Sequence, residues 1–402
     1  MAKNNKYKRE LIKFYLTING IITNIPDVYT AHLRKMNTND KKLRETRKKY
    51  FVKKGNKEYI KLKGIEIIDK LNDSNIQTSR SLELVLKSQY VTLFLIFENY
   101  VRQIIKLSLA SNKEILKQTE DNISLNEILE FSNINEMVSF SIDREVDEAL
   151  RDKKSICEWI KKNFKIEIPN IHDLSKHFVR YNSIRNLIVH NNSIANKMYI
   201  QNCIRVGFNK NELPGVGKDI IITPGIFIDA VNNLYLMGIQ IGLSLWINTI
   251  PKEKKLIEDF IIDEQAKFIE NKKFHSAEII SNIANAVIRE YSKKDIKYII
   301  MINKAISLTF QKKNKLAMKV LEGVKSESTD FKLAIHLIKR EFKLASLLMD
   351  KIDKEDLRFY YRHWPIFKLH RKTKILTKVY KKRIGNLDLY EVVKSKNNKK
   401  SL

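Results

Sequence analysis

The chain is poor in residues that break helices and in residues that build disulfide or metal frameworks. Its 402 residues include only 11 Gly, 6 Pro and 2 Cys. Scarce Gly and Pro argue against a turn-rich all-β fold and favour helices. The two cysteines, Cys157 and Cys203, offer no disulfide framework and suit a reducing compartment. Since no Cys or His spacing matches a zinc site, we expect no metal and no cofactor.

Long uninterrupted apolar runs are also missing. The most apolar stretch, residues 226–250, contains Asp229, Asn232 and Asn233, so it predicts a buried protein helix and not a membrane span. Thr223 and Pro224 precede it and are typical of a helix cap and first turn. The first fifteen residues are charged and lack the apolar core of a signal peptide. We therefore expect a cytoplasmic protein with no membrane partner.

Positive charge is abundant but unevenly placed. The formal net charge is +29, with +12 in residues 1–80, zero in residues 81–250 and +17 in residues 251–402. A neutral middle between two basic ends favours a polyanionic partner, most simply RNA or DNA. The alternative is that lysines merely cover solvated helix faces.

The basic N-terminal region, residues 1–75, reads as three short helices followed by a β-hairpin. Ile25-Pro26 would open the second helix, and residues 41–49 would form the third. Residues 50–60 alternate around a turn at Lys54-Gly55-Asn56, which predicts a hairpin. This order resembles a winged helix, whose third helix often contacts nucleic acid. Lys48 and Lys49 are then candidate nucleic-acid contacts, and DNA is one candidate partner of this domain; the alternative is an accessory or dimerisation domain.

The remainder predicts a mainly α protein with two more domains. Residues 76–250 contain a long core helix over 82–110, shorter helices, and short extended runs around a Gly-rich loop. Residues 251–402 predict successive helices, among them 330–350 and 366–382. Lys315-Leu316-Ala317 with Leu321 recurs as Lys343-Leu344-Ala345 with Met349. That spacing of 28 residues suggests helical hairpins in a repeat-like array, although chance similarity between amphipathic helices is an open alternative.

The central region carries the best candidate for chemistry. Arg185, Asn186 and His190 stand close together, and Asn186 and His190 are four residues apart, which places them on one helix face. Cleavage of RNA without metal needs a base for the 2′-hydroxyl, a cation for the phosphate and an acid for the leaving oxygen. Histidine suits proton transfer and arginine suits phosphate. Asn182 or Ser183 would cap a helix starting near residue 184, with Arg185 in its anion-favouring first turn.

Arg185, Asn186 and His190 match the Arg-Asn-x-x-x-His signature, and at these residues the sequence resembles the HEPN ribonuclease superfamily. The resemblance covers about residues 80–250 and implies a helical bundle with the signature on a late helix. It implies a homodimer with a composite cleft, and 2′-hydroxyl attack that leaves a cyclic phosphate. It also implies a toxin or anti-phage abortive-infection effector, restrained by an inhibitor or trigger. Glu98, on the early core helix, would be the acidic residue near the site.

Other patterns give weaker candidates. A second Arg-to-His spacing joins Arg358 to His363, where cations alternate with aromatics around Arg362. Such a segment stacks unpaired bases or packs a core.

From the Arg185, Asn186 and His190 motif and the basic ends of the chain, we expect a metal-independent endoribonuclease acting on structured RNA, with tRNA as the first candidate. The rival interpretation is a non-catalytic nucleic-acid-binding or regulatory protein that uses the HEPN fold to dimerise.

Overall fold

The computed structural model describes residues 6–54, 57–112, 125–151, 156–168, 171–370 and 372–385. The chain is mainly α-helical and divides into two compact units, residues 1–251 and 252–402. Each unit is described by itself. Within the described residues, the sheet consists of two strands in the first unit.

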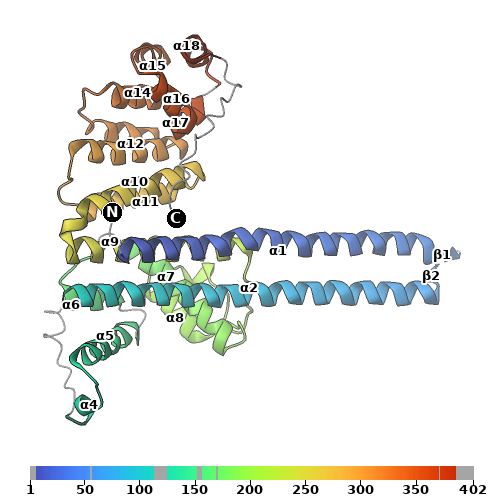
Figure 1. The fold of residues 1–402 in the computed structure, drawn as a ribbon. Helices are drawn as coiled ribbons and strands as arrows, with labels where there is room; N and C mark the ends of the chain where they lie inside the picture. Colours follow the sequence, from blue (N-terminus) through green and yellow to red (C-terminus); the bar gives the residue numbers. More distant parts are fainter. Residues whose placement is uncertain are drawn as a thin grey trace, which may run out of the picture. The chain divides into compact units, whose positions relative to one another are not determined.

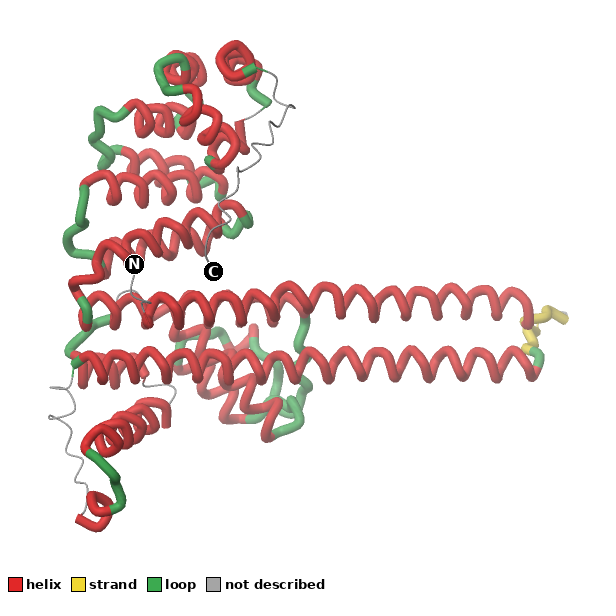
Figure 2. Tube along the Cα trace, viewed as in Figure 1, coloured by secondary structure: helices red, strands yellow, loops and turns green. Residues whose placement is uncertain are grey.

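A long antiparallel helical hairpin forms the frame of the first unit (Figure 1). Helix α1 spans Lys6–Tyr50 and helix α2 spans Leu62–Ser111. Strands β1 (Phe51–Lys54) and β2 (Lys57–Ile60) join them, with Phe51 paired to Ile60. The predicted β-hairpin is therefore confirmed, while residues 55–56 of its turn lie outside the described residues. Coloured by secondary structure, the strands stand out at the far end of the two helices (Figure 2).

The predicted winged helix is wrong, because residues 6–50 form one helix where three were expected. Pro26 lies inside α1 and does not open a second helix. A proline removes one backbone donor, but α2 runs alongside α1 through this region (Figure 1) and packing outweighs local propensity. Lys48 and Lys49 are exposed in the last turn of α1, beside the β-hairpin.

Helix α9 (Pro224–Thr249) packs against both long helices and closes the core of this unit. The predicted cap is confirmed, since Thr223 Oγ1 accepts the backbone N–H of Ile226 at 3.2 Å. Gly238 and Gly242 leave room for aromatic side chains from the hairpin, and an added Cβ on Gly242 would lie 2.1 Å from the Tyr100 hydroxyl. Among the described helices, α9 alone is long and apolar enough to cross a membrane, and 78% of its most apolar window is buried in the protein.

The two ends of the first unit meet in this core. The Tyr7 hydroxyl lies 2.7 Å from Ser108 Oγ and 2.9 Å from Thr249 Oγ1. The ring of Tyr7 stacks on Trp246, with centroids 5.8 Å apart. The start of α1 is therefore fixed by the end of α9, more than 200 residues later in the sequence.

Five shorter helices complete the described part of the first unit. Of these, α7 packs against α2, α8 and α9. Their bounds are α4 Leu125–Leu129, α5 Ile134–Arg151, α6 Ile156–Phe164, α7 Ile171–His190 and α8 Lys197–Arg205.

The second unit consists of nine α-helices within its described residues. They are α10 Lys254–Glu270, α11 Phe274–Val287, α12 Lys294–Phe310, α13 Asn314–Leu321, α14 Thr329–Ile338, α15 Phe342–Met349, α16 Lys354–His363, α17 Pro365–His370 and α18 Lys374–Ile384. The helices expected over 330–350 and 366–382 are each split in two. Arg340 accounts for the first split, because its φ of 61° is left-handed and ends α14.

The same tight turn joins three helix pairs, α10–α11, α12–α13 and α14–α15. Its left-handed residue is Lys272, Lys312 or Arg340, with φ of 59°, 64° and 61°. In each turn the next residue donates its N–H to the carbonyl five residues earlier, as in a Schellman motif. A buried alanine follows five residues after each left-handed residue, at 277, 317 and 345. The repeat seen in the sequence at 315–321 and 343–349 falls on the second helix of two of these pairs.

Candidate functional site

Arg185, Asn186 and His190 lie together on the last two turns of α7. Asn186 and His190 are exposed on one face, and Arg185 is half-buried beside them. Arg185 Nη1 donates a hydrogen bond of 3.0 Å to Asn186 Oδ1. These three residues, which we call the α7 strip, thus present a positioned guanidinium and an imidazole on one surface.

The helix around the strip differs from the expected one. Helix α7 begins at Ile171, so Asn182 and Ser183 are internal and buried, with 5% and 7% of their surface exposed, and do not cap a helix start. Buried Leu174 and Phe178 extend the apolar face upstream, which explains the early start. Arg185 therefore lies near the C-terminal end, where the helix dipole favours cations and not anions. Phosphate binding would depend on the guanidinium and not on free helix N–H groups.

The end of α7 is fixed by the loop that follows it. The N–H groups of Asn191 and Ser193 both donate to the carbonyl of Leu187, each at 2.9 Å. Ser193 in turn accepts the N–H of Ile220 at 2.8 Å, and Gly217 donates to Ala195 at 2.8 Å. The Gly-rich loop, residues 214–219, is therefore hydrogen-bonded to the segment that follows the α7 strip in sequence. His190 sits on a helix end held by backbone hydrogen bonds.

Two polar groups at the strip have no hydrogen-bond partner among the described residues. They are the Nε of Arg185 and the Oδ1 of Asn182, both buried atoms. Asn182 precedes Asn186 by one helical turn, but it is buried where Asn186 and His190 are exposed. A buried donor or acceptor without a partner is costly. Both atoms lie beneath the surface that carries Asn186 and His190. The sequence predicts Asn182 as a cap, whereas the structure places it inside α7, one turn before Asn186.

More cations stand on α7 before the strip. Lys176 Nζ lies 4.7 Å from the ring centroid of Phe208, and the Arg180 guanidinium lies 5.0 Å from it. Arg180 also hydrogen-bonds Tyr199, whose pKa burial raises to about 12. These contacts hold two positive charges on the helix that carries the α7 strip, which suits an anionic substrate.

Glu98 does not lie level with Arg185. The rings of Phe97 on α2 and Phe178 on α7 have centroids 5.5 Å apart. Phe178 precedes Arg185 by seven residues, which is about 10 Å along a helix. Tyr90, earlier on α2, donates to the carbonyl of Tyr181 at 3.1 Å, so the two helices run antiparallel. Glu98 therefore lies on the side of Phe178 away from the strip.

The candidates Arg358, Arg362 and His363 lie on α16 in the second unit. Arg362 donates a hydrogen bond to the Tyr380 hydroxyl, and the His363 ring lies 4.8 Å from that of exposed Phe359. Neighbouring Tyr361 is buried and stacks on Tyr380, with centroids 4.0 Å apart. The aromatics of this segment thus divide between the core and an exposed face.

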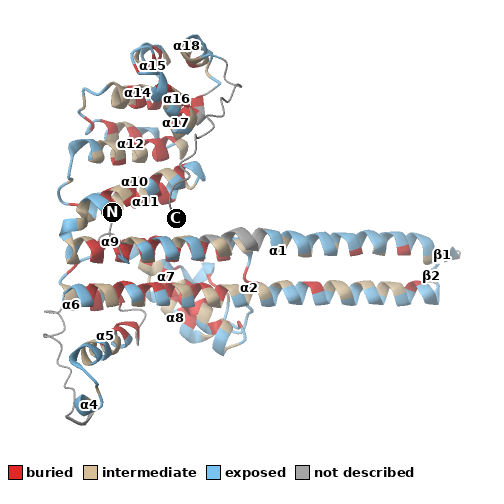
Figure 3. Cartoon of the chain, viewed as in Figure 1, coloured by how far each residue is buried: buried red, intermediate tan, exposed pale blue. Residues whose placement is uncertain are grey.

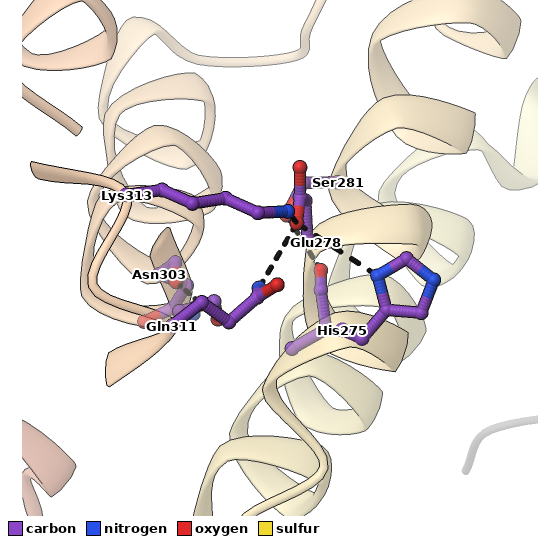
Figure 4. A network of polar contacts seen from close by, with 8 residues as sticks. His275, Glu278, Ser281, Asn303, Gln311 and Lys313 are labelled. Atoms are coloured by element: carbon purple, nitrogen blue, oxygen red, sulfur yellow. Dashed lines mark hydrogen bonds and ion pairs between the residues drawn. The ribbon is translucent and has the colours of Figure 1, made fainter. Parts of the chain in front are cut away.

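The second unit also contains a polar cluster between α11 and α12–α13 (Figure 4). Glu278 Oε2 accepts from Gln311 Nε2 at 2.9 Å and from Lys313 Nζ at 3.0 Å, with His275 Nδ1 3.9 Å away. Burial alone would raise the pKa of Glu278, but these hydrogen bonds and positive charges outweigh it and lower the pKa. The carboxylate joins one helix pair to the next, which is a structural role.

Titratable groups elsewhere in the described part of the chain form no metal site, and its thiols are unreactive. Among the described residues, no group of three His, Cys, Asp or Glu side chains is placed to hold a metal ion. Both cysteines are free thiols. Burial raises the pKa of Cys157 to about 12 and also raises that of Cys203. Thiols of this kind are poor nucleophiles at neutral pH.

Comparison with known proteins gives no relative. The chain matches no family model, no curated protein and no solved structure. Any functional assignment therefore depends on the residues and geometry described above.

Proposed function

We propose that the chain is a metal-independent endoribonuclease of the HEPN type, acting through the α7 strip. The observation that supports this most is the contact between Arg185 and Asn186, one helical turn before exposed His190. In this proposal the first unit contains a HEPN-like bundle, and the second is a basic helical-repeat domain. The proposed role is that of a toxin or anti-phage abortive-infection effector, with RNA as its substrate and tRNA as the first candidate.

The chemistry assigns one task to each residue. His190 takes the proton of a 2′-hydroxyl, whose oxygen attacks the adjacent phosphorus and expels the 5′-oxygen, leaving a 2′,3′-cyclic phosphate. Arg185 binds the phosphate oxygens as negative charge develops on them. Asn186 Oδ1 holds the guanidinium in place, and its amide N–H groups remain free to donate. The leaving oxygen then requires a proton from a second group.

A homodimer would supply that second group. The strip has one histidine, but the reaction has two proton transfers, so two strips facing each other give one base and one acid. Val189, next to His190 on α7, is an exposed apolar residue, with 47% of its surface accessible, and Met198 at the start of α8 is 68% exposed. A second copy would cover them and close a cleft over both strips.

The test is cleavage of total cellular RNA by purified protein in excess EDTA. We expect His190→Ala to lower the cleavage rate at least about 100-fold, the usual range for loss of a general acid or base. His172→Ala, an exposed histidine at the start of α7, is the matched control and should cut normally. Equal cleavage by wild type and His190→Ala would refute the proposal.

The second candidate function is non-catalytic nucleic-acid binding through the same fold. The exposure of His190 and Asn186 in a single chain is the observation that favours it. Under that alternative, neither wild type nor His190→Ala cuts, even at high concentration, and both bind RNA equally. Expression in cells would also show no difference in toxicity between them.

A further inference from the structure

The distal part of the helical hairpin extends past the rest of the first unit. We call it the arm and define it as residues 27–85, which include the ends of α1 and α2 and the β-hairpin tip. Figure 1 shows α1 and α2 continuing side by side beyond α7 and α8. The exposed colour covers most of this section, whereas buried residues concentrate where the hairpin meets α9 (Figure 3).

The arm is strongly basic near its tip. Residues 34–63 contain thirteen Lys and Arg against three Asp and Glu, a net charge of +10 in thirty residues. Every basic side chain described there is exposed, and none pairs with a carboxylate within the described residues. They are Arg34, Lys35, Lys41, Lys42, Arg44, Arg47, Lys48, Lys49, Lys53, Lys57, Lys61 and Lys63.

Few residues of the arm are buried. Its buried residues, among those described, are Asn39, Thr46, Gly64 and Thr78, all small or polar. Asn39 Nδ2 donates to Ser74 Oγ at 3.1 Å and to Asn75 Oδ1 at 2.9 Å, so polar groups hold the two helices together. Little apolar area is buried to offset the mutual repulsion of the charges. This composition suits a binding surface and not a core element.

The tip presents two faces of the β-hairpin. Register places Val52 and Tyr59 opposite each other, with 37% and 51% of their surface exposed. Lys57 lies on the same face as Tyr59, two residues before it. The other face carries Phe51 and lines a cavity of about 610 Å³ with the cations Arg47 and Lys48 and the carboxylates Glu58 and Asp69. Both faces combine exposed apolar surface with cations.

The tip lies at a fixed distance from the α7 strip. Ile220, bonded to Ser193 just behind His190, shares a cavity of about 490 Å³ with Leu82 and Leu86 of α2. The strip is thus level with about residue 82, twenty residues from the start of α2 at Leu62. At 1.5 Å per residue, the tip lies about 30 Å further along the arm. This length is close to one helical turn of a nucleic-acid duplex.

We propose that the arm binds the phosphate backbone of a base-paired RNA stem and sets the distance between the stem and the cleaved bond. The part about cleavage rests on the proposed function; the part about binding does not. Arg34, Lys41 and Lys48 recur every seven residues along α1 and so lie in a row on one helix face, which fits the regular phosphates of a duplex. A single strand would need stacking aromatics along the whole surface, yet apart from Tyr29 the aromatics of the arm are confined to the tip, at Tyr50, Phe51 and Tyr59.

Binding is tested apart from cleavage with His190→Ala protein and fluorescently labelled 16-base-pair RNA stem. The arm variant is Arg44→Gln, Lys48→Gln, Lys53→Gln; the control variant is Lys325→Gln, Lys343→Gln, Lys351→Gln, three exposed residues of the second unit. We expect the arm variant to bind at least tenfold more weakly near 100 mM salt. Its slope of log affinity against log salt should fall by about 3, because each phosphate contact contributes about 0.9.

Three results of that assay would overturn the proposal. They are equal weakening by the arm and control variants, equal affinity for the stem and for its single strand, or arm-dependent binding to vesicles with anionic lipid but not to the stem. Circular dichroism melting of each variant tests whether its fold is intact. If wild type does not cut any RNA, the proposed function fails, while these binding results still decide the role of the arm.

The distance is tested by shortening the arm symmetrically. Deleting residues 37–43 of α1 and 71–77 of α2 removes two turns from each helix, including the Asn39 contacts with Ser74 and Asn75. The tip then moves about 10 Å closer to the strip. We expect cleavage to move about three base pairs towards the stem. An unchanged cleavage position in a variant that still binds the stem would show that the arm does not set this distance.

Discussion

The hydroxyl of Tyr90 on α2 donates a hydrogen bond of 3.1 Å to the carbonyl of Tyr181 on α7. That carbonyl lies one helical turn before Arg185, so this bond joins the long hairpin to the helix that carries the α7 strip. Tyr90 is fully buried, and burial raises the pKa of its hydroxyl well above the ordinary value. The hydroxyl therefore stays protonated and acts as a donor at neutral pH.

Tyr90→Phe removes this hydrogen bond and keeps the ring. We expect the free energy of unfolding to fall by about 1 kcal/mol, the usual contribution of one buried hydrogen bond. Urea unfolding followed by circular dichroism measures it. Tyr59→Phe, at an exposed position in the arm, is the control and should leave the midpoint unchanged. An equal midpoint for wild type and Tyr90→Phe would show that the bond does not stabilise the fold.

Gly242→Ala tests how closely α9 packs on the hairpin. The added Cβ would lie 2.1 Å from the Tyr100 hydroxyl and 3.2 Å from Leu11 Cδ2, so the neighbours must move. We expect a loss of about 1–3 kcal/mol of unfolding free energy, as for other overpacked cores. Gly225→Ala, where the nearest side-chain atom is 3.7 Å away, should be neutral or stabilising. If both variants melt at the wild-type temperature, the close approach of α9 is not present.

The lowered pKa of Glu278 predicts that the stability of the second unit depends on pH. Its pKa lies below the ordinary value of 4.5. A carboxyl with a lowered folded-state pKa stabilises the protein above its unfolded-state pKa, and that stabilisation is lost as pH falls through the folded-state pKa. We expect Glu278→Gln to cost about 1 kcal/mol at pH 7 and to flatten the loss of stability below about pH 4.5. Urea midpoints between pH 7 and pH 3 measure this.

The control for that experiment is Glu327→Gln. Glu327 pairs with Lys332 but is 97% exposed, so solvent and salt screen the pair. Its substitution should shift the midpoints less than Glu278→Gln does. If the urea midpoints of wild type and Glu278→Gln fall equally as the pH is lowered from 7 to 3, the assigned role of the Glu278 cluster is contradicted.

Substitution by glycine should have opposite effects on stability at a left-handed turn residue and inside a helix. Lys312 has φ of 64° at the turn between α12 and α13, a conformation that costs a non-glycine residue about 1 kcal/mol. Lys312→Gly should therefore raise the unfolding free energy by up to about 1 kcal/mol. Lys319→Gly, at an exposed position inside α13, should lower it by about 1 kcal/mol. Two changes of the same sign in thermal melts would refute this account.

Local patterns in the sequence predicted the elements whose signals are local. Thr223 and Pro224 mark the start of α9, and the alternation of residues 50–60 marks the hairpin. The single long helix α1 was missed because Pro26 argues locally for a break, whereas its continuity depends on α2, which follows later in the chain. The start of α7 was placed too late for the same reason. Leu174 and Phe178 belong to a core built by distant helices, so polar Asn182 and Ser183 looked like a cap.

For the candidate site, the sequence predicted which residues share a helix face but not their surroundings. The spacing of Asn186 and His190 was sufficient to place them together. The position of Glu98 relative to Arg185 could not be predicted, because it depends on how α2 and α7 are aligned along their length. The link between Ser193 and Ile220 joins segments 27 residues apart and has no local signal.

The stacking of Tyr7 on Trp246 has a consequence for synthesis of the protein on the ribosome. Helix α1 can complete its packing only after the last turns of α9 have left the exit tunnel. At about 5–20 residues per second, this takes on the order of 10–50 s. Until then α2 and α7 lack the helix that holds both, and such non-local contacts form slowly. A nascent chain would therefore lack the packed core around α7 until the end of α9 has emerged.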